Sequence, residues 1–161
     1  MPQPLHKSDR LVVRVRQGWL EAGTILRHAS FYADPQTGEL KSKFLLVLTT
    51  TGGGDVVWRL LTSRQYGRPE EPRCYHGDPY PGFYLGVIDT SAGLGKKSWL
   101  DLHPLDDGDG IDVAKLLNAG MLTVAATIPE VLLRAALECA AAADDTTLAQ
   151  ERAIRDALAV M

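Results

Sequence analysis

The sequence has few of the features that mark specialised protein classes. Only two of its 161 residues are cysteines, so we expect no disulfide framework and a reducing cytoplasm as the compartment. No apolar run approaches the roughly 18 residues that a membrane-spanning helix needs. The N-terminal residues MPQPLHKSDR lack the apolar stretch of a signal peptide. No internal repeat is present, which argues against a solenoid.

Charge of either sign is also modest, with a formal net charge of −3. It is unevenly placed, however. Residues 1–100 hold 13 Lys or Arg and 9 Asp or Glu, a net charge of +4, whereas residues 101–161 hold 4 and 11, a net charge of −7. Such a balance argues against nonspecific binding of nucleic acid over the whole surface. It leaves room for a local phosphate-binding site in the basic part.

The pattern of apolar residues places strands first and helices last, which predicts the α+β class. The composition, 45% hydrophobic and 23% charged, is that of an ordinary globular domain. The turn residues at 34–38 and the glycines at 52–54 join three of the strands into an antiparallel meander. Strands are expected at residues 11–16, 24–32, 43–50, 56–62, 84–88 and 98–102.

The first two of the three expected helices have recognisable starts. Asp112 is a good N-cap for a helix over residues 113–119, and Gly120 follows at the position where helices commonly end. Thr127 and Glu130 have the spacing of a capping box, which predicts an Ala-rich helix that continues to about residue 143.

The last helix is expected to begin at Thr147, whose capping partner is Gln150. Ile154, Leu158 and Met161 then fall on one helical face. The chain is accordingly divided into an N-terminal arm, a barrel-like body with helices, and a terminal helix, at residues 1–18, 19–143 and 144–161.

No metal and no cofactor are expected. The four aspartates between residues 106 and 112 lack the spacing of a calcium loop and are better explained as helix caps. The glycines at residues 91–98 lack the spacing of a phosphate-binding Walker loop. Cys74, His76 and His103 are scattered over about 30 residues, which is weak evidence for zinc.

The strongest candidate site lies at one end of the predicted meander. Lys41 and Lys43 open one strand, and Thr62 and Ser63 close its antiparallel partner, so pairing brings the two ends together. Together with Arg27 or His28 from the preceding strand, these groups could hold a phosphodiester. The alternative is that both lysines are solvated strand-end charges and Thr62 is a turn former. A long irregular segment, residues 63–83, supplies further groups for such a site: Arg64, Tyr66, Arg68 and Arg73.

Short segments in a fixed order resemble the MazF/PemK (Kid) family of toxins, which are small SH3-like barrels that cleave RNA. Gly23-Thr-Ile-Leu resembles the opening strand of that family, and Lys43-Phe-Leu-Leu-Val-Leu-Thr resembles its Arg-Pro-Val-Val-Ile strand. Asp55-Val-Val-Trp-Arg-Leu-Leu-Thr-Ser resembles the next strand, which ends in Thr-Ser. The strand at residues 98–102, a short helix, Gly120 and a final helix follow in the order of the family.

The resemblance implies a metal-independent, sequence-selective endoribonuclease that uses the 2′-OH of the RNA as nucleophile. Lys43 and the Thr62-Ser63 pair stand at the positions of the family's catalytic Arg and Thr-Ser, and His28 is the candidate for proton transfer. The implied partners are single-stranded RNA, an antitoxin protein and a second copy of the chain.

The chain departs from the family pattern because Lys43 and Phe44 replace its Arg-Pro pair. Lysine does not reproduce the bidentate grip of arginine on phosphate. The alternative is therefore an inactive barrel that acts as an RNA-binding or protein-interaction module. The RNA-binding candidates are Arg27, Lys41, Arg64, Tyr66, Arg68 and Arg73.

Overall fold

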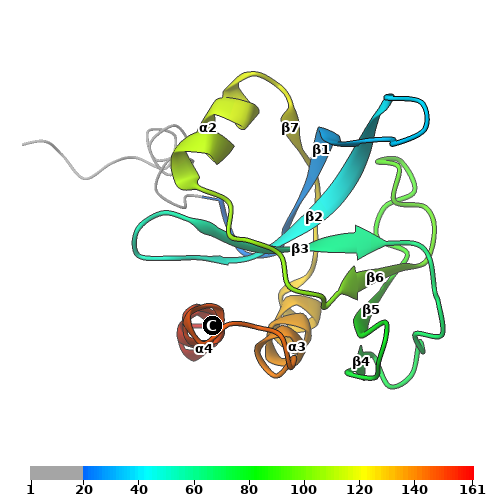
Figure 1. The fold of residues 1–161 in the computed structure, drawn as a ribbon. Coiled ribbons are helices and arrows are strands. Elements are labelled where there is room, and N and C mark those ends of the chain that lie inside the picture. The colour runs from blue at the N-terminus through cyan, green and yellow to red at the C-terminus, as the bar shows by residue number, and fades with distance from the viewer. Residues whose placement is uncertain (1–19) are drawn as a thin grey trace, which may run out of the picture.

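The computed structural model describes residues 20–161, which form one antiparallel sheet flanked by helices (Figure 1). The strands lie in the order β4-β5-β6-β3-β2-β1-β7, so the sheet is open, with β4 and β7 at its edges. The α+β class is confirmed, with the helices towards the C-terminal end. The predicted arm at 1–18 and strand at 11–16 lie outside the described residues. The elements are β1 (Thr24–Ala33), β2 (Leu40–Thr50), β3 (Val56–Thr62), β4 (Cys74–Tyr75), β5 (Gly82–Gly86), β6 (Ser98–Asp101), α2 (Gly110–Asn118), β7 (Leu122–Thr127), α3 (Glu130–Ala141) and α4 (Leu148–Ala159).

The predicted meander of β1, β2 and β3 is confirmed. Ile25 pairs with Leu46, and Leu45 pairs with Leu60, both in antiparallel register. The first turn forms as its chemistry predicts, because the Asp34 carboxylate accepts hydrogen bonds from two backbone N–H groups and Gly38 takes a φ of +72°.

Strand β3 belongs to both halves of the sheet because it changes partner along its length. Its first part pairs with β2, and the pairing ends at Leu60 opposite Leu45. Leu61 and Thr62 pair instead with β6. Beyond Leu60, the strands β2 and β3 therefore diverge at one end of the meander.

Two apolar cores lie on opposite faces of the meander, because alternate residues of a strand point to opposite sides. On one face, Leu46 and Val57 pack in a core with α3 and α4. On the other face, Leu45 and Trp58 pack in a core with Val113 of α2. Figure 1 shows the same division, with α2 on one side of the sheet and the pair α3 and α4 on the other.

A buried arginine ties α4 to the centre of the sheet. Arg59 in β3 has no exposed surface, and its guanidinium donates to the Gln150 side chain at 2.8 Å and to the Trp58 carbonyl at 2.8 Å. Gln150 in turn donates to the Asp107 carboxylate at 2.8 Å. Burial lowers the pKa of Arg59, and the charges of Asp107 and Asp101 partly offset this effect.

The helix starts differ in part from the prediction. Helix α2 begins at Gly110, because Asp109 rather than Asp112 accepts the capping hydrogen bonds, and Gly120 follows its end with a φ of +75°. The capping box of Thr147 and Gln150 at the start of α4 is confirmed, with both of its hydrogen bonds present.

The prediction that Thr127 caps a helix is wrong. Residues 122–127 form β7, which pairs antiparallel with β1, and Pro129 occupies the N-cap of α3 without a side-chain hydrogen bond. The ladder with β1 satisfies several backbone groups of this segment, whereas a cap satisfies only one or two.

The two cysteines, too few for a disulfide framework, form a single disulfide. Cys74 in β4 is bonded to Cys139 in α3, although 65 residues separate them. Cys139 is buried in the Ala-rich helix, as expected for a core residue.

The longest helices of the described part have 12 residues each, too few to cross a bilayer.

Replacement of Gln150 tests the buried network. We expect Gln150→Ala to lower the free energy of unfolding by about 3 kcal/mol, because it leaves the Arg59 guanidinium buried without its side-chain acceptor. Urea denaturation measures the change. Thr147→Ala removes only the helix cap and should cost about 1 kcal/mol. Arg155→Ala removes an exposed ion pair and should cost under about 1 kcal/mol. Equal losses for Gln150→Ala and Thr147→Ala would show that the network adds nothing beyond the cap.

Candidate functional site

Two adjoining hollows lie where β2 and β3 diverge. Both are lined by the same four residues at the strand ends, Lys43, Leu61, Thr62 and Arg64. The first hollow adds Ser63 and part of the 91–98 loop, and the second adds aromatic and charged residues of the segment after β3. We call the two hollows together the strand gap.

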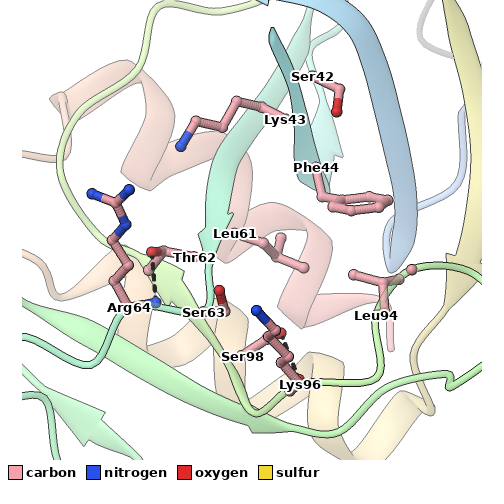
Figure 2. A pocket seen from close by; sticks show the side chains of 11 residues that line it. Ser42, Lys43, Phe44, Leu61, Thr62, Ser63, Arg64, Leu94, Lys96 and Ser98 are labelled. Atoms are coloured by element: carbon pink, nitrogen blue, oxygen red, sulfur yellow. Dashed lines mark hydrogen bonds between the residues drawn. The ribbon is translucent and has the colours of Figure 1, made fainter.

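The lysine and the threonine face each other across the strand gap. Continuing the register of Leu45 and Leu60 by two residues places Lys43 opposite Thr62, on the same face of the sheet. Figure 2 shows the Lys43 amine, the Thr62 hydroxyl and the Arg64 guanidinium on one side of the strand gap. The prediction that Lys43 and Thr62 meet at one end of the sheet is confirmed.

The polar groups of the strand gap are free to contact a ligand. The Thr62 hydroxyl accepts a hydrogen bond from the Arg64 backbone N–H at 3.1 Å, so its own proton can be donated outwards. The Lys43 amine lies 5.7 Å from the centre of the Tyr32 ring. Within residues 20–161, no carboxylate lies within ion-pair distance of Lys43. A cation and a hydroxyl donor therefore face the same space.

Aromatic rings form one wall of the second hollow. The rings of Tyr66 and Tyr80 are stacked with their centres 4.9 Å apart, and they are 52% and 39% exposed. The Arg64 guanidinium donates to the Tyr66 hydroxyl at 2.8 Å, and this hydrogen bond raises the pKa of Arg64. Exposed stacked rings beside cations are typical of surfaces on which bases of a single strand stack.

Arg68 lies beneath this wall and fixes the loop that carries it. The side chain is only 2% exposed and donates to the backbone carbonyls of Pro81 and Arg64 at 3.2 and 3.0 Å. Its guanidinium also lies 3.7 Å from the Asp101 carboxylate. Burial lowers the pKa of Arg68, and Asp101 offsets part of this effect. The predicted RNA-binding role of Arg68 becomes a positioning role here.

Of the two histidines near the strand gap, His103 has both ring nitrogens engaged by the protein, and His28 lies outside the two hollows. His28 pairs with Lys43 across the strands, but its Nδ1 accepts a hydrogen bond from the Ser30 backbone at 3.2 Å, and burial lowers its pKa. His28 does not line either hollow. The ring nitrogens of His103 lie 2.7 Å from the Asp101 carboxylate and 2.7 Å from the Pro79 carbonyl.

Three predicted RNA-binding residues lie away from the strand gap. Arg27 stands opposite Phe44 and therefore points to the other face of the sheet. Lys41 pairs with Glu39 at 3.1 Å. Arg73 donates to the Tyr84 carbonyl at 2.8 Å. None of the three lines either hollow.

The sequence-based prediction missed several residues that line the strand gap, and Asp101, His103 and Tyr80 are among them. Asp101 and His103 come from the end of β6, and Tyr80 comes from the irregular segment. The alternation Asp101-Leu102-His103 was the available signal, because residues two apart in a strand share a face. That face only becomes part of the site once β6 pairs with β3.

Cysteine and histidine gather at a second place, between β4 and α3. The disulfide-bonded sulfurs of Cys74 and Cys139 and a ring nitrogen of His76 lie within 4.8 Å of one another. His103, which the sequence analysis weighed as the third ligand, is bound to Asp101 instead. Among residues 20–161, this is the only group of three or more His, Cys, Asp or Glu side chains whose ligand atoms lie close enough to hold one metal ion.

Comparisons with protein-family models, with curated proteins and with solved structures found no match for this chain.

Replacement of Arg68 tests its positioning role. We expect Arg68→Ala to raise the initial rate of trypsin cleavage after Arg64 by about tenfold, because the segment loses its buried anchor. Lys97→Ala removes an exposed ion pair with Glu70 in the same segment and should change the rate less than about twofold. Mass spectrometry of the early fragments measures both rates. Similar rates for the wild-type protein and Arg68→Ala would contradict the role.

Proposed function

We propose that the strand gap binds single-stranded RNA. The observation that carries this proposal is the convergence of Lys43 and Thr62 beside the exposed Tyr66–Tyr80 stack. The lysine offers a charge to a phosphate, and the threonine hydroxyl donates a hydrogen bond to a phosphate oxygen. The two rings offer a surface for an unpaired base. The net positive charge of residues 1–100 supports a local phosphate site on this part of the chain.

The salt dependence of binding tests this proposal. Binding of a short fluorescent RNA should weaken as salt rises, with a slope of log K against log salt of about −0.7 for each phosphate contacted. Lys43→Met should make the slope less steep by about 0.7 and reduce affinity severalfold. Lys115→Met on α2, an exposed lysine outside the strand gap, should leave the slope unchanged. No binding at low salt, or equal slopes for both variants, would exclude the strand gap as an RNA site.

A second proposed function is cleavage of the bound RNA through its own 2′-OH. The hydroxyl of Thr62 supports this proposal, because its oxygen accepts a hydrogen bond within the protein and its proton can be donated to a ligand. A hydroxyl that donates to the phosphoryl oxygens can stabilise the phosphorane. Lys43 adds a positive charge on the same side. In this reaction the O2′ attacks phosphorus while its proton passes to water, and the bond between phosphorus and the 5′-oxygen breaks. The departing 5′-oxygen takes a proton from water, so the products are a 2′,3′-cyclic phosphate and a 5′-hydroxyl. Because His28 lines neither hollow and both ring nitrogens of His103 already have protein partners, binding is better supported than cleavage.

Cleavage is tested with RNA in EDTA. The active protein should cut RNA there and leave intact a strand with 2′-deoxyribose at the cleaved position. Thr62→Val should lower the single-turnover rate by about 100-fold or more, the cost of removing one donor to an oxyanion. Thr123→Val, an exposed threonine of β7, should retain the rate. Binding without any cleavage would identify a non-catalytic RNA-binding module.

The interpretation of the chain as MazF/PemK-like belongs to the same proposal. In it, the sheet is a variant of the family's SH3-like barrel, and the change of partner along β3 supports this arrangement. An antitoxin partner, a homodimer and a cytoplasmic location are proposed on the resemblance alone.

A further inference from the structure

The cluster of Cys74, His76 and Cys139 lies outside the strand gap and has the composition of a metal site. Cys74 belongs to β4, His76 follows it by two residues, and Cys139 lies in α3. The Nε2 atom of His76 lies 3.4 Å from the Cys74 sulfur and 3.5 Å from the Cys139 sulfur. Two thiolates and an imidazole are ligands that zinc prefers.

The spacing of these atoms fits two edges of a tetrahedral zinc centre. With Zn–S bonds of about 2.3 Å and a Zn–N bond of about 2.0 Å, tetrahedral angles separate nitrogen and sulfur by about 3.5 Å, and the two sulfurs by about 3.8 Å. Both distances from the His76 nitrogen to sulfur already match. Only the distance between the sulfurs differs, because they form a disulfide.

We propose that Cys74, His76 and Cys139 bind one Zn²⁺ ion when the disulfide is reduced. A thiol or phosphine reductant supplies two electrons, and two protons from water complete the two thiols. Zinc then displaces both thiol protons and binds two thiolates. In the oxidised protein the Nε2 of His76 lies 3.0 Å from the Cys139 carbonyl, which can only accept, so this nitrogen carries the ring proton. It binds the metal once that hydrogen bond is released and the proton has moved to Nδ1.

The surroundings leave the fourth ligand position open to solvent. His76 lines a hollow together with Asp78, Asp144 and Asp145. These carboxylates attract a cation to the hollow, and a water molecule or one of them completes the tetrahedron. Either the disulfide or the zinc ion holds β4 against α3. The inference does not depend on RNA binding at the strand gap.

Metal titration of the reduced protein tests the inference. After reduction with a phosphine and removal of the reductant without air, the protein should bind one Co²⁺ per chain, with the near-ultraviolet absorption of a cobalt–thiolate bond. Zn²⁺ should displace the cobalt, and competition with a chromophoric chelator gives its affinity. The oxidised protein, whose sulfurs are bonded to each other, should show no such absorption and bind zinc at least about 100-fold more weakly.

Variants separate the proposed ligands from their neighbours. His76→Ala keeps both cysteines and should weaken zinc binding at least about tenfold. His103→Ala should keep the wild-type zinc affinity, because the ring of His103 contacts Asp101 and Pro79 instead. Cys74→Ser/Cys139→Ser should abolish the cobalt–thiolate absorption, and the oxidised wild-type protein is the folded reference if this variant does not fold. A reduced protein that binds zinc no better than the oxidised one, or unchanged zinc affinity in His76→Ala, would overturn the inference.

Discussion

The change of partner along β3 is the constraint on which both the fold and the strand gap depend. Strand β3 lies between β2 and β6 in the sheet, with one neighbour on each side. Its pairing with β2 ends at Leu60, and its pairing with β6 begins at Leu61. Beyond Leu60, β2 no longer pairs with β3, and Lys43 and Thr62 line the open space between the two strands. The two halves of the sheet and the site between them thus meet at the same point of β3.

The strand gap combines groups from four separate parts of the chain. Lys43 comes from β2, Thr62 from β3 and His103 from just after β6, while Tyr66 lies in the loop held by the buried Arg68. Because its ring nitrogens already contact Asp101 and Pro79, His103 forms part of the wall of the strand gap and is not assigned to proton transfer. The groups that remain available in the strand gap are the Lys43 amine, the Thr62 hydroxyl and the exposed Tyr66 ring. Any cleavage would depend on charge and hydrogen-bond stabilisation by Lys43 and Thr62.

The sequence was most informative where structure is local. The bounds of β3 were predicted correctly, and the placement of Lys43 and Thr62 at the same end of the meander follows from antiparallel geometry once two strands and their turn are recognised. The prediction failed where distant segments decide. Thr127 has the spacing of a helix cap, but pairing with β1 makes its segment a strand. The bond between Cys74 and Cys139 and the burial of Arg68 also depend on the path of the irregular segment, which no local pattern encodes.

The contact between Arg59 and Gln150 also constrains the order in which the chain can fold during its synthesis. Gln150 leaves the ribosome 91 residues after Arg59, which at about 5 to 20 residues per second is a delay of about 5 to 20 s. During that time the guanidinium has no side-chain acceptor from α4 and is better solvated than buried. The face of β3 that carries Arg59 can therefore close only after the last helix has been made. Folding of this domain is completed only once α4 has been synthesised, although its meander is made early.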